Sequence, residues 1–474
     1  MTDAQGHAED EPGRWREIFI GRLGVYTLIL NLGMAVFAIN HFVVSTIMPT
    51  VVADIGGLDF YTWAFSLFAV GSIVGAASAG PISDAYGMRR VYAGAGLLMG
   101  LGLAGNAMAW DMQSVVAFRL VQGIGGGAVA SLAYGLVAML YPHNLRSRVL
   151  AIVSGIWGFG TLSGPAVGGF FAEPGLWRGS FWTMMGFALA FAVLAWRYVD
   201  GEKKGGKLSD LPFWRLSMLA LSVLLMSATS LSDRDAWRIG LFVLAVIIAG
   251  VAFHRDARSV RNMFPRGITA IMSQLGASYW VLFLVSIVIT AHNTYTTYYL
   301  QLLHGVAPLT AGYILAAQSM MWTVSALGLS GAKRDQEPYL IAAGLLCMLI
   351  ASVGIALSLE HGPVAIIAGC LGLSGFGMGL LNIPAMQRVI TAAAEADKQL
   401  AGISVQTVRN IGISFGAALT GMVAAMAGLT DNSSVAEVVH AMHWVYGVNI
   451  GFALLSFLAV IPVFIHRHDP PGST

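Results

Sequence analysis

The stretch "GPISDAYGMRR", residues 80–90, joins two long apolar segments and indicates how the chain is organised. Gly80 and Gly87 allow a tight reversal of the backbone, because glycine adopts conformations that are closed to other residues. Asp84 lies between them, where its carboxylate can meet the positive N-terminal end of another helix or a basic side chain. The basic pair Arg89 and Arg90 follows. The stretch therefore predicts a short helix–loop–helix connection with a charged turn.

The composition around this stretch is that of an all-α integral membrane protein. Of the 474 residues, 57% are hydrophobic and only 11% are charged, with a mean hydropathy of +0.72, whereas soluble chains carry about 25% charged residues. Apolar runs of roughly 20 residues, long enough to cross the hydrocarbon core, recur along the whole chain. About fourteen spans are predicted, near 23–49, 60–82, 91–109, 113–140, 148–172, 178–198, 213–231, 236–254, 276–302, 309–330, 338–359, 363–390, 400–429 and 442–465.

The distribution of lysine and arginine predicts the orientation. Outside loops carry only Arg178, Arg234 and Arg238, and the other basic loop residues fall on the opposite side. Since basic loops stay in the cytoplasm and the number of spans is even, both termini are predicted to be cytoplasmic, with the chain in a cell membrane, most simply a bacterial inner membrane. The connections are too short to house a catalytic domain, so an enzyme is not expected.

Glycine-rich stretches mark a coarse internal repeat. "RLVQGIGGGAVASLAYG" in the fourth span resembles "GLSGFGMGLLNIP" in the twelfth, and "GIWGFGTLSGPAVGGFF" in the fifth resembles "RNIGISFGAALTG" in the thirteenth. Glycines also simply let membrane helices pack closely. Two six-helix bundles are nevertheless predicted, with a substrate site at midplane between them. The boundaries are a tail at 1–21, a first bundle at 22–199, a linker with two inserted helices at 200–262, a second bundle at 263–466 and a tail at 467–474.

These motifs resemble those of the major facilitator superfamily. "GPISDAYGMRR" is similar to its cytoplasmic signature, "RLVQGIGGG" to its fourth-helix motif, and "GFGTLSGPAVGG" to the antiporter motif of its fifth helix. With fourteen spans, the whole chain resembles the fourteen-helix drug:proton antiporter branch. Relatives in that branch export drugs, antiseptics, lipids, fatty acids and siderophores, so the architecture does not identify the substrate.

The resemblance implies roles for particular residues. Asp84, Arg89 and Arg90, with Gly80 and Gly87, would latch the cytoplasmic side, although Ala85 and Met88 replace residues that are usually basic and so put the strength of the latch in doubt. Arg119 would act in proton coupling. The antiporter motif would be carried by Gly158, Gly160, Gly164, Pro165, Gly168 and Gly169.

Four ionisable residues lie well inside the predicted spans, and such residues are functional candidates by default. They are Arg119, Arg409, His41 and His292, whereas every Asp and Glu falls in a tail, a loop or a span end. Aligning "INHFVVSTIMP" with the first-helix motif of the branch puts Asn40 where that motif has an aspartate. His41 is therefore the first candidate for the proton carrier and His292 the second, because histidine titrates near pH 6.5. A neutral, purely structural histidine, a carboxylate at a span end (Asp54, Asp59 or Glu173) and no proton at all remain alternatives.

Polar and aromatic residues at helical spacing are candidates for lining one substrate cavity. They are Asn40, Gln122, Trp157, Asn293, Thr296, Tyr299, Gln318, Trp322, Gln406, Arg409 and Asn410. The alternative for each is a packing hydrogen bond between helices, with a net value of roughly 0.6 kcal/mol. A further aromatic set could anchor the chain at the membrane interface, namely Tyr61, Trp63, Trp177, Tyr279 and Trp280.

The absence of a buried carboxylate argues against a dedicated cation pump, because a fixed positive charge needs compensation when it leaves water. We therefore expect an exporter of small neutral or anionic amphipathic compounds, working by alternating access and driven by protons. A lipid or fatty-acid exporter and a proton-independent facilitator are alternatives, and a receptor or membrane enzyme fits less well.

"GEKKGGKL" at 201–208 and "GIGGGA" at 123–128 fail as nucleotide motifs. No cofactor, metal or nucleic acid is expected, and the protein is expected to be a monomer in the lipid bilayer.

Overall fold

The computed structural model describes residues 15–200, 213–232, 234–259, 262–328, 336–394 and 397–465, which form fourteen α-helices joined by short turns. The helices are α1 (Gly21–Ile55), α2 (Trp63–Tyr86), α3 (Met88–Ala107), α4 (Met112–Leu140), α5 (His143–Ala172), α6 (Arg178–Tyr198), α7 (Phe213–Ala228), α8 (Asp235–Ala257), α9 (Gln274–His304), α10 (Pro308–Gly328), α11 (Glu337–Ser358), α12 (Val364–Ala392), α13 (Lys398–Met426) and α14 (Val435–Ile465). Short 3₁₀ turns flank α1, α2 and α7.

The all-α membrane fold expected from the sequence is confirmed. Each helix overlaps one predicted span, and the largest shift is at α14, which begins at Val435 rather than near residue 442. Eleven helical segments of the described chain are long and apolar enough to cross a membrane. The helices α3, α5 and α10 fall outside that set. Glycine and polar residues lower the hydropathy of α5, yet α5 packs along α1 and α10 like the other helices of the bundles.

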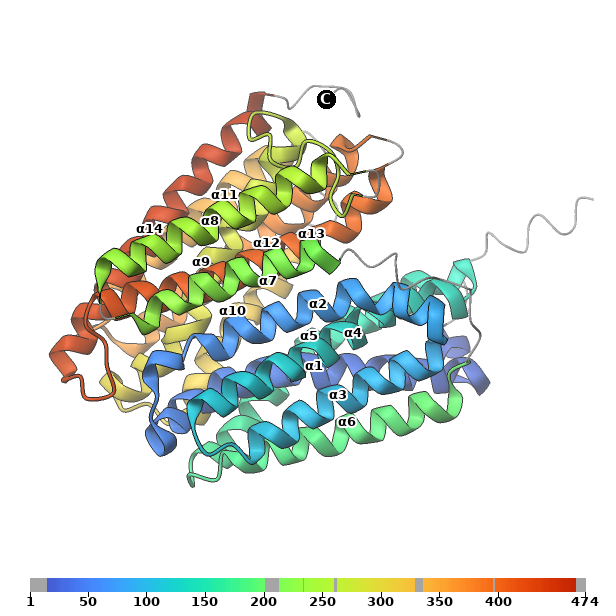
Figure 1. Ribbon diagram of the computed structural model, residues 1–474, viewed down its shortest axis with the longest axis horizontal. Helices are drawn as coiled ribbons and strands as arrows, with labels where there is room; N and C mark the ends of the chain where they lie inside the picture. The colour runs from blue at the N-terminus through green and yellow to red at the C-terminus, as the bar shows by residue number, and fades with distance from the viewer. Residues whose placement is uncertain are drawn as a thin grey trace, which may run out of the picture.

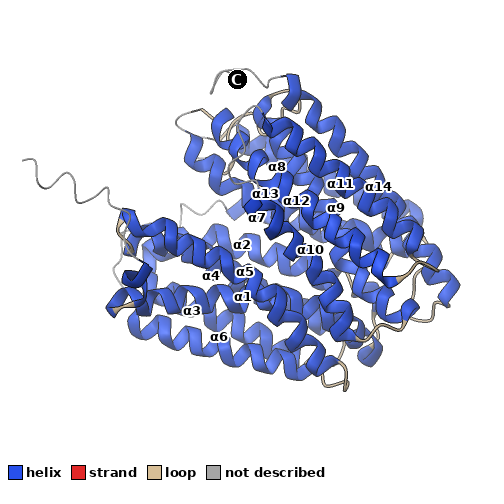
Figure 2. Cartoon of the chain, turned by 180° about the vertical axis from the view of Figure 1, so that it is seen from behind, coloured by secondary structure: helices blue, strands red, loops and turns tan. Residues whose placement is uncertain are grey.

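Two six-helix groups repeat one packing scheme (Figures 1 and 2). In the first group α2 and α3 pack on α4, α3 packs on α6, and α1 packs on α5. In the second group α10 and α11 pack on α12, α11 packs on α14, and α9 packs on α13. The pairs correspond one to one, so α1–α6 and α9–α14 share one internal architecture. We call them the N bundle and the C bundle; the residue boundaries of the five predicted segments stay a prediction, and the segment "GEKKGGKL" lies outside the described residues.

The inserted helices α7 and α8 form a hairpin beside α13 (Figure 1). The helix α8 packs on α7, and only 11% of its most apolar window is buried inside the protein, as expected for a helix that faces lipid. The helix α7 contacts both α13 and α2. Ser227 Oγ lies 3.0 Å from Ser66 Oγ, and Trp63 Nε1 donates to Ser230 Oγ at 2.9 Å. Trp63 is therefore tied to the hairpin.

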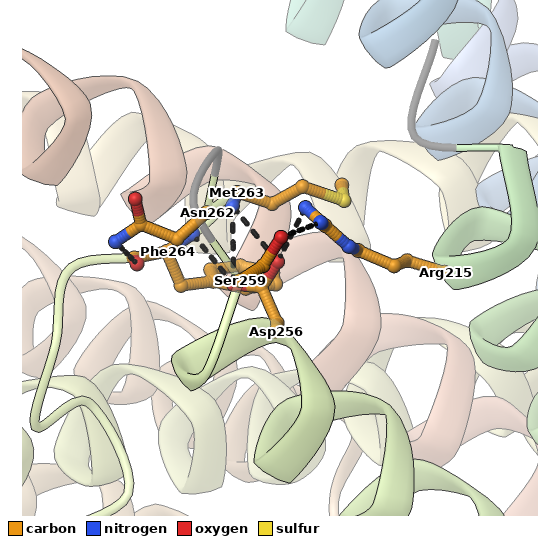
Figure 3. Close-up of polar contacts among 6 residues, drawn as sticks. All are labelled: Arg215, Asp256, Ser259, Asn262, Met263 and Phe264. Atoms are coloured by element: carbon orange, nitrogen blue, oxygen red, sulfur yellow. Dashed lines mark hydrogen bonds and ion pairs between the residues drawn. The ribbon is translucent and has the colours of Figure 1, made fainter.

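A buried ion pair holds the other end of this hairpin (Figure 3). Arg215 on α7 lies 2.9 Å from Asp256 on α8, and the two side chains are only 9% and 3% exposed. Asp256 also accepts hydrogen bonds from the backbone N–H groups of Met263 and Phe264, at 2.9 and 3.0 Å, and Arg215 bonds to Ser259. These contacts fix the segment that leads into α9 to the hairpin.

The two bundles meet at one end and diverge toward the other. The bundle-to-bundle hydrogen bonds of the described chain lie at the end that carries residues 56–62, 294–301 and 431. In both views the ribbons of the two bundles separate toward the opposite end, where α1 begins and α14 ends (Figures 1 and 2). We call these the closed end and the open end.

Candidate functional site

The closed end is held by hydrogen bonds between α1 and α9. Thr297 Oγ1 donates to the carbonyl oxygen of Ser45 at 2.7 Å, and Gln301 Nε2 donates to that of Thr46 at 3.3 Å. The Ser45 carbonyl has no helical partner, because Pro49, four residues later, lacks an N–H. The Thr46 carbonyl can also accept, because a helix carbonyl retains a second lone pair. The two bundles therefore meet along α1 and α9 through polar contacts.

A tyrosine cluster closes the same end, with Tyr61 in the turn before α2 and its partners on α9. The Tyr61 hydroxyl donates to the carbonyl oxygen of Thr294 at 3.0 Å, and its ring stacks on Tyr295 with centroids 5.3 Å apart. Tyr298 adds an edge contact at 5.6 Å. Tyr61 is fully buried, so its ring is covered by protein and does not face lipid. The contact between bundles, which a sequence does not show, decides where this ring lies; Trp177 and Tyr279 are likewise buried inside the bundles.

Asp431, in the turn between α13 and α14, reaches across to the N bundle. Its carboxylate accepts from the N–H of Leu58 at 2.8 Å and from the N–H of Gly57 at 3.0 Å. Gly57 has φ of 82°, a conformation that favours glycine. Hydrogen bonds to a carboxylate are stronger than neutral ones. Asp431 is thus a latch between the bundles at the closed end.

The antiporter-motif glycines of α5 lie where α5 meets α1 and α10. A Cβ added at Gly164 would lie 2.3 Å from Cβ of Phe42 on α1, and one at Gly169 would lie 2.6 Å from Cα of Leu309 on α10. Gly160 and Gly168 also face α1, at 3.1 and 3.0 Å, and Pro165 lies against Gly312 of α10. Gly158 has open space around it. Five of the six motif residues therefore serve close helix approach.

A buried polar cluster ties together α1, α3 and α4 of the N bundle. Gln122 donates from Nε2 to Asn40 Oδ1 at 2.7 Å, and its Oε1 accepts from Arg119 at 2.9 Å and from Asn106 at 3.2 Å. Arg119 also donates from Nε to the Ala64 carbonyl at 2.9 Å, and its guanidinium lies 4.0 Å from the Phe68 ring centroid. Asn40, Gln122 and Arg119 thus meet in one cluster.

A second buried cluster occupies the corresponding helices of the C bundle. His292 on α9 lies between two serine hydroxyls, with Nδ1 3.0 Å from Ser374 on α12 and Nε2 3.1 Å from Ser352 on α11. Asn449 on α14 lies 3.1 Å from the same Nε2, and Gln318 donates to Ser374 at 3.2 Å. His292 is fully buried, with both ring nitrogens in contact with polar groups.

Tyr446 extends this second cluster toward the closed end. Its ring stacks on His292 at 6.1 Å, and its hydroxyl lies 3.1 Å from Thr296 Oγ1. Tyr299 packs edge-on against Tyr446 at 6.0 Å and is fully buried. Asn293, one residue on from His292, is half-buried on another face of α9.

His41 lies apart from both clusters. Its ring is half-buried and makes edge contacts with Phe42 at 5.4 Å and with Trp157 at 6.4 Å. Its nitrogens have no hydrogen-bond partner within the described part of the chain, and Trp157 is 37% exposed. Of the two histidines, His41 therefore has the more accessible ring.

On the C bundle, Arg409 and Trp322 come together. The Arg409 guanidinium on α13 lies 5.2 Å from the Trp322 ring centroid on α10, and Arg409 Nε is buried without an acceptor. One turn away, Gln406 donates to Asn410 Oδ1 at 3.0 Å, and Gln406 is exposed. The sequence predicted Gln406, Arg409 and Asn410 on one stretch of helix, and the structure adds Trp322 to it.

The charged turn at 80–90 lies at the open end. Gly87 has φ of 93°, which explains the glycine between α2 and α3. Arg89 donates from Nε to the Val199 carbonyl at 2.7 Å, and Arg90 is exposed. Asp84 is half-buried and has no hydrogen-bond or ion-pair partner among the residues the structure describes. Among the described residues, no hydrogen bond or ion pair joins this turn to the C bundle.

The candidate residues do not line one cavity in this conformation. Asn40, Gln122 and Arg119 are buried inside the N bundle, and His292 and Gln318 are buried inside the C bundle. These five do not share a cavity in this conformation, because polar groups in a bundle first satisfy one another across neighbouring helices. Five cluster members were not predicted from the sequence, namely Asn106, Ser352, Ser374, Tyr446 and Asn449. Asn106 and Asn449 are isolated amides in apolar runs, a signal that could have found them.

Known proteins agree with this architecture. The family model of the Major Facilitator Superfamily matches residues 30–417. A protein of Mycobacterium tuberculosis named as a probable multidrug-efflux transporter is 30% identical over 481 residues, covering 97% of each chain. Multidrug resistance protein 3 of Bacillus subtilis is 29% identical over 153 residues, covering 32% of this chain and 30% of its own.

Solved structures share the fold. A D-xylose–proton symporter superposes with a TM-score of 0.64 at 18% identity, over 93% of this chain and 97% of its own. A bacterial homologue of the human lysosomal transporter Spinster, in an inward-facing and unoccupied conformation, gives 0.65 at 13% identity, over 94% and 97%. With fourteen helices in two related bundles and a family match across most of its length, the chain is a multi-pass membrane transporter that belongs to the Major Facilitator Superfamily.

Proposed function

We propose that this protein is a secondary active exporter of small amphipathic compounds that works by alternating access. The observation that carries the proposal is the 30% identity to a probable multidrug-efflux transporter over 97% of both chains. The geometry supports it, because one end of the bundle interface is closed by Tyr61, Asp431 and the α1–α9 contacts while the other end diverges. A carrier that exposes one end at a time needs such an asymmetry.

The substrate is proposed to be neutral or anionic. Arg119 and Arg409 lie within the membrane-spanning helices, and α3, α4, α5, α9, α10, α12 and α13 carry no Asp or Glu within their bounds. A buried arginine costs about 2.5–3.5 kcal/mol at the centre of a membrane helix. The field of two such cations opposes a cationic substrate and favours an anion.

Flux through purified protein in liposomes tests this function. With a pH gradient imposed, we expect export of the anion 1-anilinonaphthalene-8-sulfonate (ANS) and of its neutral analogue N-phenyl-1-naphthylamine (NPN), and little movement of the cation ethidium. Transport of ethidium alone would contradict the charge argument. Flux of a fluorescent phospholipid without flux of either naphthyl compound would instead make the protein a lipid exporter.

Proton antiport is proposed to use His41. Its ring is half-buried beside the exposed Trp157, and α1, α4 and α5 offer it no carboxylate except Asp54 at the closed end, which pairs with Arg178 at 2.7 Å. Histidine is the side chain whose ordinary pKa suits a switch near neutral pH.

A His41→Gln protein is expected to lose at least about tenfold of its pH-gradient-driven ANS flux, because glutamine keeps the polarity but cannot bind the proton. Downhill ANS flux without a pH gradient should stay within about twofold of wild type, which separates coupling from folding. His292→Gln is the matched comparison, since His292 is fully buried. Undiminished gradient-driven flux in His41→Gln would remove His41 as the carrier.

The open end is proposed to be cytoplasmic, so that the structure represents an inward-facing state. Asp84, which has no partner among the described residues in this state, would gain one when this end closes. The bias of basic loops supports a cytoplasmic position for both termini. A bacterial inner-membrane location and a monomeric state are part of the same proposal.

An Asp431→Ala protein is expected to open its closed end more often, because two N–H groups lose a charged acceptor. A loss of about 1 kcal/mol would raise the population opened at this end about fivefold. The rate at which a maleimide labels Thr294→Cys, a position that is 1% exposed, reports this population. The cysteine must be the sole one in the chain. Asn432→Ala, next to Asp431 and exposed, should leave the rate unchanged; equal rates in all three proteins would exclude a latch at Asp431.

A further inference from the structure

We propose that Arg409 and Trp322 form an anion-binding site for the head group of the transported amphiphile. The site rests on the proposed function, which it extends by naming the residues that recognise the charge. Its ligand class is an amphipathic monoanion whose head group offers two oxygen acceptors to one guanidinium, such as a carboxylate or a sulfonate.

Arg409 is a cation without a counter-ion. Its Nε is buried with no acceptor, and the described residues place neither a carboxylate nor a carbonyl in hydrogen-bond contact with its guanidinium. Its partner is the face of Trp322, at 5.2 Å. An aromatic face attracts a cation but supplies no acceptor for its five N–H donors. The arrangement therefore leaves the fork of donors free for a ligand.

Arg119 is different, although it is also a buried arginine. It donates to the Ala64 carbonyl and to Gln122, it packs on Phe68, and it is only 1% exposed. Arg119 is thus satisfied inside the N bundle and holds its helices together. Of Arg119 and Arg409, Arg409 is therefore the one with unused donors.

The register of α13 shows where this site opens. At the closed end Gly421 faces α2, since a Cβ added there would lie 2.1 Å from Thr62 Oγ1. Asn410 lies eleven residues earlier, so at 100° per residue it is on nearly the same face, rotated by about 20°. The α13 residues from Ser414 to Gly421 are buried, whereas Gln406 is exposed and Asn410 is half-buried. The face that meets the N bundle at the closed end therefore becomes accessible at Asn410 and Gln406.

The helices α5 and α10 also change from buried to exposed along one face. Gly169 of α5 meets Leu309 of α10, while Leu162 and Gly158, seven and eleven residues earlier on the same face, are exposed. On α10 itself Gly312 is buried, and Thr323, eleven residues later on the same face, is exposed. Arg409 and Trp322 border these exposed faces, on the bundle side that a ligand would reach from the open end.

The chemistry of the site suits an oxyanion. A guanidinium binds a carboxylate or sulfonate through two parallel N–H donors, and a lysine cannot reproduce that geometry. Gln406, which donates to Asn410, lies three residues before Arg409 on α13, so its exposed amide is within about one helical turn of the Arg409 guanidinium. Trp322 offers an apolar ring beside it for the body of an aromatic amphiphile.

Equilibrium binding of ANS and NPN to the purified full-length protein tests the site, because the two probes share a skeleton and differ in the sulfonate. Arg409→Gln is expected to weaken ANS binding at least about tenfold and to leave NPN binding within about twofold. Arg409→Lys should weaken ANS binding by an intermediate factor, since it keeps the charge and loses the fork. Arg197→Gln is the control, because it removes an exposed arginine from α6.

Each outcome decides the matter. Unchanged ANS affinity in Arg409→Gln would overturn the proposal, and an equal loss for ANS and NPN would show that Arg409 acts only on structure. If Arg409→Gln does not fold, Arg409→Lys and Trp322→Leu carry the test, and Trp322→Leu is expected to weaken ANS binding. Should wild-type protein move neither probe in liposomes, the proposed function itself fails, whatever the binding data show.

Discussion

A Gly164→Ala protein is expected to lose most of its transport and to unfold at a lower temperature than wild type. The added Cβ would lie 2.3 Å from Cβ of Phe42, a distance that forces α5 and α1 apart. Overpacking of a tight contact costs about 1–3 kcal/mol. The displacement also moves His41, which is next to Phe42 and packs on Trp157 of α5. We therefore expect at least tenfold slower ANS flux, measured with the melting temperature in detergent.

Gly158→Ala is the matched control for this prediction. Gly158 belongs to the same motif and the same helix, but no atom lies within 4 Å of the Cβ that alanine would add. Its melting temperature and flux should equal those of wild type, within the roughly 0.5 kcal/mol expected of a surface change. Wild-type behaviour of Gly164→Ala, or an equal defect in both variants, would contradict the account of the motif as a close-approach surface.

An Asp256→Ala protein is expected to be the least stable of the variants considered. Arg215 would lose its carboxylate partner while it remains buried, and the N–H groups of Met263 and Phe264 would lose their acceptor (Figure 3). Breaking a buried pair by removing one partner costs about 3–5 kcal/mol. A fall in melting temperature and a lower yield of folded protein in detergent measure the effect.

Two comparisons isolate the buried pair. Asp200→Ala breaks the ion pair of Asp200 with Arg22, in which the two side chains are 53% and 67% exposed. An exposed ion pair contributes at most about 1 kcal/mol to stability. The double variant Arg215→Met with Asp256→Ala removes both charges and should recover part of the loss. A double variant no more stable than Asp256→Ala would show that the N–H groups, and not the loss of the carboxylate from Arg215, cause the damage.

Much of the fold could be predicted from the sequence because few backbone structures can cross a membrane. Apolar runs of sufficient length must be helices, and the short loops fix their antiparallel order. Gly87 could also be assigned to a turn from the sequence, because glycine adopts backbone conformations that are closed to other residues. Its φ of 93° agrees with this assignment. The antiporter-motif glycines were also found, although that motif did not reveal which of them touch α1 and which face open space.

The site was harder to predict, because side-chain partners depend on helices far apart in the chain. Arg119, Gln122 and Asn40 were each singled out, but nothing local shows that Gln122 joins the other two or that Asn106 completes the cluster. Tyr61 looked like an interface anchor because the sequence cannot show that α9 covers it. The Arg409–Trp322 pair joins α13 to α10, so neither helix alone predicts it.

The two ends of the bundle interface are expected to open in alternation. Distances between pairs of spin labels in the reconstituted protein measure this opening, after serine replaces its two cysteines, Cys347 and Cys370. One pair, at Tyr86 and Ala394, reports the open end, and the other, at Leu176 and Asn432, reports the closed end; all four positions are exposed.

We expect that lowering the pH or adding ANS shifts both distance distributions in opposite directions. The distance at the open end should shorten in the same fraction of molecules in which the distance at the closed end lengthens. Distributions that stay fixed under conditions that support flux, or that lengthen together, would contradict alternating access between these two bundles.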